Sequence, residues 1–121
     1  GVLGMGGVNA DDLAFQAFAA AHTELAGQGP DFWASATTYA TLEVLGQAIE
    51  AVGSADRAAV LAHLQDRANS YETILGPVSF NENNDNERYW TVGQWQNGVF
   101  RGVSARGRDG AVDVQLFDGW N

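Results

Sequence analysis

The spacing of apolar residues changes once along this chain of 121 residues, and the change limits the fold more than any other feature. Between Asp12 and Ala68 apolar side chains recur three and four positions apart, which is typical of amphipathic helices. After Asn69 the pattern becomes short runs of aromatic and β-branched residues separated by turn residues, which is typical of strands. The sequence therefore predicts a mixed α/β fold in which three helices are followed by short strands.

The first helix is predicted over Asp12–Ala26, with either Asn9 or Asp11 as its N-terminal cap. Residues 27–30, Gly-Gln-Gly-Pro, form a clear stop signal. At helical spacing, one face carries Phe15, Phe18, His22 and Leu25. This spacing indicates an amphipathic helix with an aromatic face.

A second and longer helix is predicted from Trp33 to Val52, and Gly53 occupies the position where a left-handed residue ends a helix. Its apolar face carries Thr38, Leu42, Leu45, Ile49 and Val52. Ser54 or Asp56 is expected to cap the third helix. The apolar positions of that helix include Val60, Leu61, Leu64 and Ala68.

The first strand signal is Thr73–Phe80, a short apolar run interrupted by Gly76-Pro77. Proline cannot donate a ladder hydrogen bond, so this run is predicted as a strand that is broken at a bend or lies at a sheet edge. The polar, Asn-rich residues Asn81–Arg88 are predicted to form a loop.

The Asn97-Gly98 dipeptide is the strongest hairpin signal in the chain. It separates two strand-like runs, Tyr89–Gln96 and Val99–Ala105. Arg106–Gly110 is predicted as a second turn. A final strand is predicted from the alternation of Val112, Val114 and Leu116.

The order of these elements points to a missing sheet. The long helices have wide apolar faces, but no strand signal precedes them, whereas an α/β domain normally alternates strands and helices. We therefore expect the sheet to lie upstream of Gly1 and interpret the chain as one segment of a larger protein. In isolation such a segment would expose apolar helix and strand surfaces, so self-association is expected.

Composition excludes several functional classes. The net charge of −9 argues against binding to nucleic acid or to an anionic membrane surface, because both need clustered lysine and arginine. The absence of cysteine excludes disulfides, thiolate zinc sites and cysteine nucleophiles. No apolar run approaches the roughly 18 residues that a membrane-spanning helix needs.

The two histidines give no metal or catalytic pattern. His22-Thr23-Glu24 imitates the start of a zinc deaminase motif, but no cysteines complete the site. A partly buried helical position is the better interpretation of His22. His63 has no His or carboxylate partner at metal spacing and is assigned to the surface or to a helix boundary.

Other partial motifs also fail. Asn81, Asn83 and Asp85 alternate as in a calcium loop, but Asn86 and Val92 replace the required glycine and bidentate glutamate, so a solvated turn is predicted. No serine lies in a Gly-x-Ser-x-Gly elbow. No catalytic residue, metal ligand or cofactor site is therefore predicted.

The glycine-rich stretch 4–7 does not complete a dinucleotide motif and has no downstream P-loop lysine. A flexible crossing segment is the preferred interpretation of this stretch. Asp11 and Asp12 are adjacent at a helix start, where their negative charges interact favourably with the helix dipole. Their spacing does not suit general acid–base catalysis.

Two large rings, Phe32 and Trp33, stand at the entrance of the long helix. A helix N-terminus offers unpaired N–H groups, and adjacent rings offer an apolar wall, a pairing that suits a small polar ligand with an apolar side. The alternative is that both rings only pack the helix against its neighbours. The two interpretations are left open by the residues themselves.

Three stretches, taken in order, carry a family resemblance: residues 38–53, residues 71–80 and residues 92–100. Together they resemble the bacterial type I periplasmic binding proteins of the branched-chain amino acid and amide ABC transporters. The resemblance covers at least residues 9–100. The chain departs from the family pattern in loop 83–86, which lacks the usual glycine, and in the tail 106–121.

This resemblance implies two α/β lobes joined by crossing strands, with a solute held in the cleft between them and this chain as the C-terminal segment. Residues 1–8 would be a lobe-crossing segment, residues 9–88 the helical and strand part of one lobe, and residues 89–121 the crossing hairpin and C-terminal strands. Ligand contacts would come from Phe32 and Trp33, with Met5 of the crossing segment as a third candidate.

The function implied by the resemblance is that of the substrate-binding component of an ABC transporter. It would bind an amino acid, an amide or a related solute and deliver it to a membrane permease. The implied location is periplasmic or extracellular, with a lipid anchor on an upstream N-terminus as one form of attachment. Two alternatives remain: a ligand-sensing domain of a receptor or regulator with the same fold, and a small independent α+β enzyme.

Overall fold

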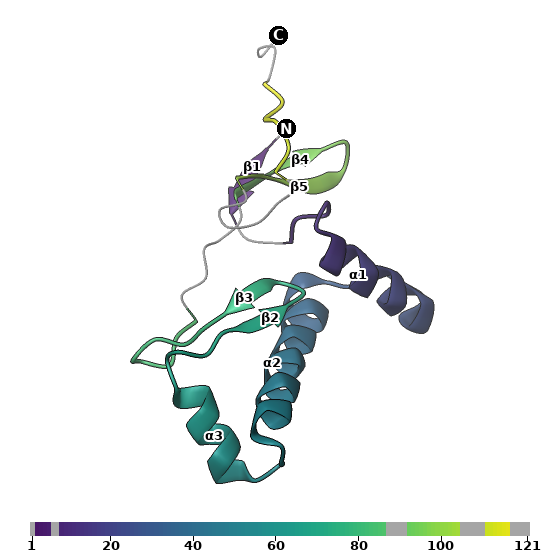
Figure 1. The fold of residues 1–121 in the computed structure, drawn as a ribbon. Helices are drawn as coiled ribbons and strands as arrows, with labels where there is room; N and C mark the ends of the chain where they lie inside the picture. The colour runs from purple at the N-terminus through teal and green to yellow at the C-terminus, as the bar shows by residue number, and fades with distance from the viewer. Residues whose placement is uncertain (1, 6–7, 87–91, 105–110, 117–121) are drawn as a thin grey trace. The chain divides into compact units, whose positions relative to one another are not determined.

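The computed structural model describes residues 2–5, 8–86, 92–104 and 111–116. The chain divides into two compact units, Gly1–Phe32 with Tyr89–Asn121, and Trp33–Arg88. In chain order the elements are β1 (Leu3–Met5), α1 (Leu13–Ala26), the π-helical turn η1 (Phe32–Ala36), α2 (Thr37–Val52), α3 (Arg57–Gln65), β2 (Tyr71–Thr73), β3 (Gly76–Val78), β4 (Val92–Gln96) and β5 (Val99–Ser104) (Figure 1). Within the described ranges this is a set of three α-helices and two small antiparallel sheets, so the predicted α/β class is confirmed, with β1 added ahead of the helices.

The hairpin predicted around Asn97-Gly98 is confirmed in the first unit. Strands β4 and β5 pair antiparallel on either side of this dipeptide. Asn97 has φ 52° and Gly98 has φ 80°, and a two-residue hairpin turn of this kind needs positive φ at both positions. The predicted ends of the hairpin, residues 89–91 and 105, lie outside the described residues.

Strand β1 pairs with the other edge of β4, which gives a sheet in the order β1-β4-β5. Gly4 lies opposite Gly93 in this pairing. The Phe100 ring covers both glycines: a Cβ on Gly4 would lie 3.6 Å from Phe100 Cε2, and a Cβ on Gly93 would overlap the ring. The Trp95 ring packs edge-on against Phe100 at a centroid distance of 5.6 Å. Two residues without side chains therefore make room for an aromatic pair on this face.

The outer edge of β5 is covered by the segment that leads into α1. The buried side chain of Asn9 accepts a hydrogen bond from the Gly102 N–H at 3.0 Å through Oδ1. Asp11 forms an ion pair with Arg101, with 2.9 Å between Oδ1 and Nη1. An exposed strand edge leaves backbone groups unpaired, and here a side-chain amide satisfies one of them.

The final strand predicted from Val112, Val114 and Leu116 is wrong, because residues 111–116 form no strand. The Val112 N–H donates to the Gly102 carbonyl at 2.8 Å. Further along, side chains of β4 bind the backbone of this segment, so the groups that would form a ladder are taken by amide side chains. The predicted turn Arg106–Gly110 lies outside the described residues.

Helix α1 is capped by Asp12, whose carboxylate accepts from the Phe15 N–H at 3.1 Å. The two predicted caps, Asn9 and Asp11, are therefore wrong, because both side chains bind β5. The helix ends at Gly27, which has φ 72° and donates its N–H back into the last turn. This end confirms the predicted stop signal.

The second unit is organised around α2. The helical backbone begins at Phe32, one residue before the predicted start at Trp33, but its first turn, η1, is π-helical and α2 itself begins at Thr37. Ala36 already has helical angles, φ −71° and ψ −43°, so the chain enters α2 from a helical turn and uses no side-chain cap. The predicted end is confirmed, since Gly53 is left-handed at φ 71°.

The run Thr73–Phe80 is broken at Gly76, as one of the two predicted alternatives has it, and the break is a full reversal that makes a tight hairpin with Tyr71–Thr73. Strands β2 and β3 pair antiparallel, with Thr73 opposite Gly76. Gly76 has φ 101°, a conformation that favours glycine and lets the chain reverse. The Thr73 hydroxyl donates to the Gly76 carbonyl at 2.7 Å and closes the turn.

Helix α3 is capped by Asp56, one of the two predicted caps, which accepts from the Ala59 N–H at 2.9 Å. The helix ends at Gln65, so the prediction that Ala68 belongs to it is wrong. Asp66 is extended, with φ −73° and ψ 111°, and its carboxylate accepts from the Ala68 N–H at 3.0 Å. This local turn competes with a further helical turn.

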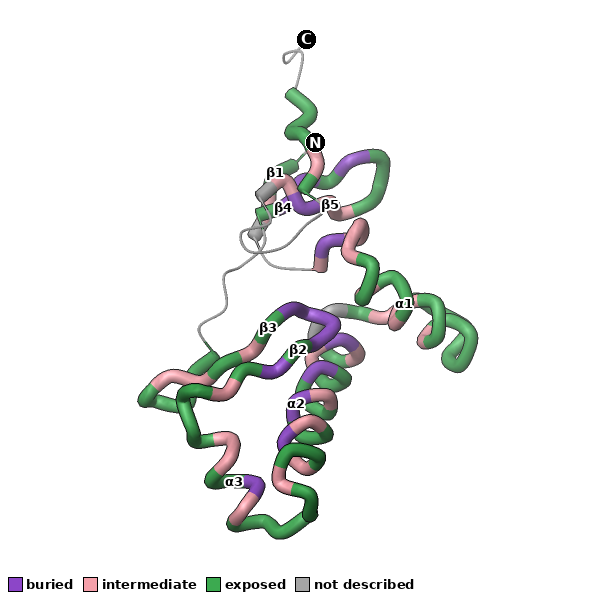
Figure 2. Tube along the Cα trace, in the orientation of Figure 1, coloured by how far each residue is buried: buried purple, intermediate pink, exposed green. Residues whose placement is uncertain are grey.

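The core of this unit lies where α2 meets α3 and the hairpin. Buried positions gather along one side of α2 and in the hairpin (Figure 2). The central residues are Val44, Ala48, Val60 and Tyr71, with Ile49, Leu64, Val78 and Phe80 packed around them. Small residues on α2 let the helix approach the hairpin closely.

Side chains of α2 also hold the free edge of β2. The Gln47 amide pairs with the backbone of Glu72 at two points, Nε2 to the carbonyl at 2.8 Å and Oε1 to the N–H at 3.1 Å. One turn earlier, Glu43 Oε2 accepts from the Ile74 N–H at 2.8 Å. The helix thus takes the place of a neighbouring strand at this edge.

Candidate ligand-binding site

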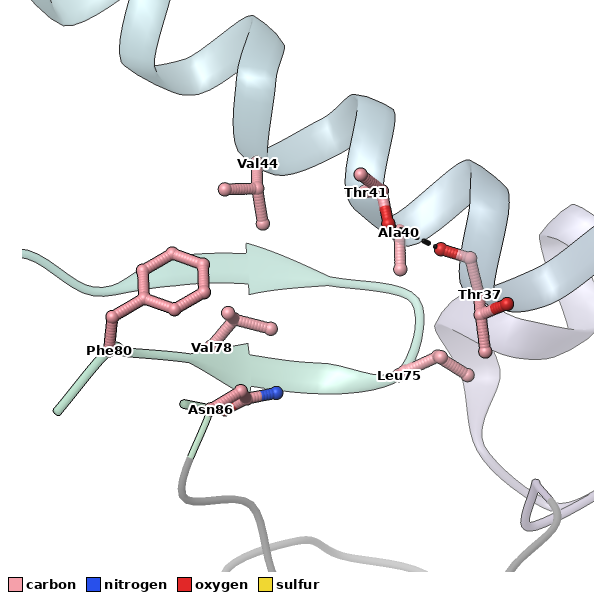
Figure 3. Close-up of a pocket in the computed structure, with 8 residues that line it drawn as sticks. All are labelled: Thr37, Ala40, Thr41, Val44, Leu75, Val78, Phe80 and Asn86. Atoms are coloured by element: carbon pink, nitrogen blue, oxygen red, sulfur yellow. Dashed lines mark hydrogen bonds between the residues drawn. The ribbon is translucent and has the colours of Figure 1, made fainter. Parts of the chain in front are cut away.

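A mainly apolar pocket lies beside the first two turns of α2 (Figure 3). This pocket has a volume of about 300 Å³. Its lining is Thr37, Ala40, Thr41, Val44, Leu75, Val78, Phe80 and Asn86. Helix α2 supplies one wall, and the β2–β3 hairpin with the residues after it supplies the other.

The chemistry of this pocket is mainly apolar. Its polar groups are two threonine hydroxyls and the Asn86 amide, and none of the lining residues that the structure describes is charged. The Thr41 hydroxyl donates to the Thr37 carbonyl at 2.9 Å, so its hydrogen is already engaged within the helix. The pocket can hold an apolar group of modest size, near the lower end of ordinary ligand pockets. The described lining therefore favours an apolar group over an ammonium or a carboxylate group.

A second groove separates α2 from α3 and has a volume of about 370 Å³. It is lined by Leu45, Ile49, Ala55, Arg57, Val60, Leu61 and Leu64. Leu45 and Leu61 are exposed, so this groove is an apolar surface that opens to solvent. Arg57 is its one charged lining residue.

The three ligand contacts predicted from sequence lie in defined backbone positions. Met5 ends β1 opposite Val92, while Phe32 and Trp33 open the π-turn η1. The side chains of all three lie outside the described residues. Their contact with a ligand therefore stays a prediction. The pocket beside α2 was not predicted, because its far wall depends on a full chain reversal between β2 and β3, whereas the sequence indicated only a bend or a sheet edge.

Both histidines have structural partners. His22 lies at hydrogen-bond distance from the Gln28 carbonyl, 3.0 Å from Nδ1, and its ring packs edge-on against Phe18 at 5.8 Å. His63 is in the last turn of α3, where Asn69 Nδ2 approaches its Nδ1 to 3.3 Å. His22 is half-buried on a helix and His63 lies at a helix end, as the sequence predicts.

Among the described residues, Tyr71 has a displaced pKa. Its side chain is 2% exposed and its hydroxyl donates to the His63 carbonyl at 3.3 Å. Burial raises the pKa of the Tyr71 phenol, a hydrogen bond with Asn69 opposes this, and the negative charge of Asp66 adds to the increase. The phenol therefore stays protonated and acts as a core group of the second unit.

The Asn-rich loop is a side-chain-stabilised turn, as predicted. Asn81 Oδ1 accepts from the N–H groups of Asn83 at 2.9 Å and Asp85 at 3.0 Å. Asn84 adopts φ 64°, and its Oδ1 accepts from Arg67 at 2.8 Å. Because the oxygens of Asn81 and Asn84 are used within the protein, this arrangement is a turn.

In the described ranges, no group of three or more His, Asp or Glu residues is placed to hold a metal ion. No described helix has the length and hydropathy needed to cross a membrane.

Comparison with known proteins supplies the family. A family model described as periplasmic binding protein matches residues 2–99, which is most of the chain. The matched residues include β1, helix α2 with the pocket and the groove beside it, and strand β4. No curated protein matches the chain significantly.

Proposed function

The chain belongs to the type I periplasmic binding proteins, and we propose on this basis that it forms part of a two-lobed receptor for an amino acid, an amide or a related small solute. The family binds small-molecule ligands, is typically non-enzymatic and is generally periplasmic or extracellular. The family match over residues 2–99 is the observation that carries the proposal.

The proposed organisation has three parts. Residues 1–8 cross between the lobes, residues 9–88 belong to one lobe, and residues 89–121 carry the crossing hairpin and the C-terminal segment. The pairing of β1 with β4 supports this assignment, because it sets the two crossing segments side by side with Leu3 opposite Gln94. The chain then supplies the C-terminal part of the two-lobed fold.

The proposed ligand contacts are Phe32, Trp33 and Met5. Phe32 and Trp33 open the π-turn η1 directly ahead of α2, which supports their assignment. An aromatic wall at the start of a helix suits the apolar side of a solute. We propose further that the receptor serves an ABC transporter permease and is held outside the cytoplasm, with a lipid anchor on an upstream segment as the means of attachment.

Calorimetric titration with amino acids, amides and aromatic acids tests this function on the full-length protein. Trp33→Ala is expected to weaken the binding of the solute about tenfold or more, since burial of a large apolar side chain contributes about 1.5–3 kcal/mol and 1.4 kcal/mol equals a factor of ten. Trp95→Ala is the matched control, because this ring is half exposed and packs on Phe100. Unchanged affinity in Trp33→Ala contradicts the site, and no binding of any solute contradicts the function.

The isolated chain is expected to self-associate. Leu42 is 60% exposed on α2, and Leu45 and Leu61 line an open groove beside it. Because burial of such residues is favourable, light scattering should give a mass that rises above the monomer with concentration. Leu42→Glu combined with Leu61→Glu should shift the mass toward the monomer. A monomer at high concentration in the unmodified chain contradicts this expectation.

A further inference from the structure

The side-chain amides of Gln94 and Gln96 stand out among the buried polar groups of the first unit. They project from alternate positions of β4, so they share one face of the sheet. Gln94 is 2% exposed and Gln96 is 6% exposed. Burial of an amide is costly unless its hydrogen bonds are made, so the partners of these two groups decide what they do.

Their partners are backbone groups of residues 111–116. Gln94 pairs with Gln115 at two points: Nε2 donates to the Gln115 carbonyl at 2.9 Å, and Oε1 accepts from the Gln115 N–H at 2.8 Å. Gln96 Nε2 donates both to the Asp113 carbonyl and to Gln94 Oε1, each at 2.9 Å. The two amides therefore form one connected network that binds the segment at alternate residues.

Apolar packing contributes little to this attachment. Within residues 111–116 only Val112 is half-buried, while Val114 and Leu116 are exposed. The Val112 N–H adds one backbone bond to Gly102. The segment is thus attached mainly by hydrogen bonds, and most of these come from the two glutamines.

We propose that Gln94 and Gln96 are positioning residues that hold residues 111–116 on β4 as a latch, which opens without breaking the β1-β4-β5 ladder. When the segment leaves, both amides become accessible to water and exchange their protein partners for solvent. The ladder keeps its own backbone bonds, such as the one from the Trp95 N–H to the Val2 carbonyl at 3.0 Å. The segment can therefore detach locally, at a lower free energy than the sheet.

The value of such a latch to the receptor rests on the proposed function. There β4 is a lobe-crossing strand, so the latch fixes where the C-terminal segment joins the crossing region. A side-chain attachment tolerates small changes of strand geometry better than a continuous ladder, because each glutamine has rotatable bonds between its backbone and its amide. The latch itself is tested without ligand, so its failure is distinct from a failure of the proposed function.

Amide hydrogen exchange followed by NMR on the full chain tests the latch. The Gln115 amide reports on the latch, and the Trp95 amide reports on the ladder. Gln94→Leu is expected to lower the protection of Gln115 relative to Trp95 about tenfold or more, because two net hydrogen bonds are lost. Gln47→Leu is the matched control: it removes the same two-point pairing with Glu72 in the other unit and should leave this ratio unchanged.

Gln94→Glu provides a second variant that keeps the shape of the side chain. Its carboxylate still accepts from the Gln115 N–H, but it sets an oxygen against the Gln115 carbonyl and brings a charge into a buried site, so a loss of protection at least as large as in Gln94→Leu is expected. Retained protection of Gln115 in both variants would overturn the latch. An equal fall at Gln115 and Trp95 would also overturn it, because Gln94 would then support the sheet as a whole.

Discussion

Tyr71→Ala is expected to lower the free energy of unfolding of the second unit by about 3–5 kcal/mol, the range for removal of a large buried ring. The Tyr71 ring lies in the central cluster with Val44, Ala48 and Val60. It also packs against the ring of Phe80 at a centroid distance of 6.4 Å. Its loss leaves a cavity between α2, α3 and the hairpin, and these elements have little other core to share.

Urea unfolding followed by far-ultraviolet circular dichroism measures this effect. Tyr39→Ala is the control, because Tyr39 is an exposed residue of α2 and its replacement should cost under about 1 kcal/mol. Tyr71→Phe separates the ring from the hydroxyl and should cost about 1 kcal/mol, the net value of the hydrogen bond to His63. If Tyr71→Ala loses no more stability than Tyr39→Ala, the central cluster is not the core of this unit.

Gly93→Ala is expected to destabilise the β1-β4-β5 sheet by about 2–3 kcal/mol, although it adds a single methyl group. The new Cβ would overlap the Phe100 ring and would lie 2.9 Å from the Arg101 carbonyl oxygen. The ring can turn only against Trp95, which packs on it, and the carbonyl belongs to the backbone of β5. Strand β5 must therefore shift away from β4.

Gly4→Ala is a matched control, since Gly4 lies opposite Gly93 and its Cβ would make only an ordinary contact at 3.6 Å from Phe100. Thermal unfolding and exchange at the Trp95 amide should show a loss for Gly93→Ala that Gly4→Ala lacks. The double variant Gly93→Ala with Phe100→Leu should recover part of the loss. Equal behaviour of the two alanine variants would show that Phe100 does not rest on Gly93.

The sequence predicts local structure well where one residue determines a backbone conformation. Asn97-Gly98 specifies its hairpin because few other residue pairs adopt positive φ twice in succession. Gly27 and Gly53 end their helices for the same reason. Asp56 caps α3 through a carboxylate that reaches the N–H three residues ahead.

Predictions fail where a residue binds a partner that lies far away in the sequence. Asn9 and Asp11 are good helix caps in isolation, but β5 binds both of them, and the cap passes to Asp12. The final strand predicted from Val112 fails for a similar reason, since side chains of β4 occupy the backbone of that segment. In both cases the competing side-chain contact spans 17 or more residues of sequence.

The candidate site, too, was predicted from the sequence only in part. The family resemblance and the aromatic pair Phe32-Trp33 are visible in the sequence, and the family match over residues 2–99 confirms the first of these. The pocket beside α2 is not visible, because Leu75 and Phe80 reach it only through the reversal at Gly76. The Gly76-Pro77 dipeptide marks a break in the run, but it does not tell whether the chain bends or reverses there.

By itself the sequence determined the helical first half, the Asn97-Gly98 hairpin, the family and the absence of any metal or nucleophile pattern, because each depends on residue types close together in the chain. Only the tertiary structure decided which side chains bind the backbone groups that no strand pairs with: Asn9 on β5, Gln47 on β2, and Gln94 with Gln96 on residues 111–116. The physical reason is that a polar side chain can form several alternative hydrogen bonds of similar free energy, for example as a helix cap or within a turn. Packing of distant segments selects one of them, since a buried amide must find its partner.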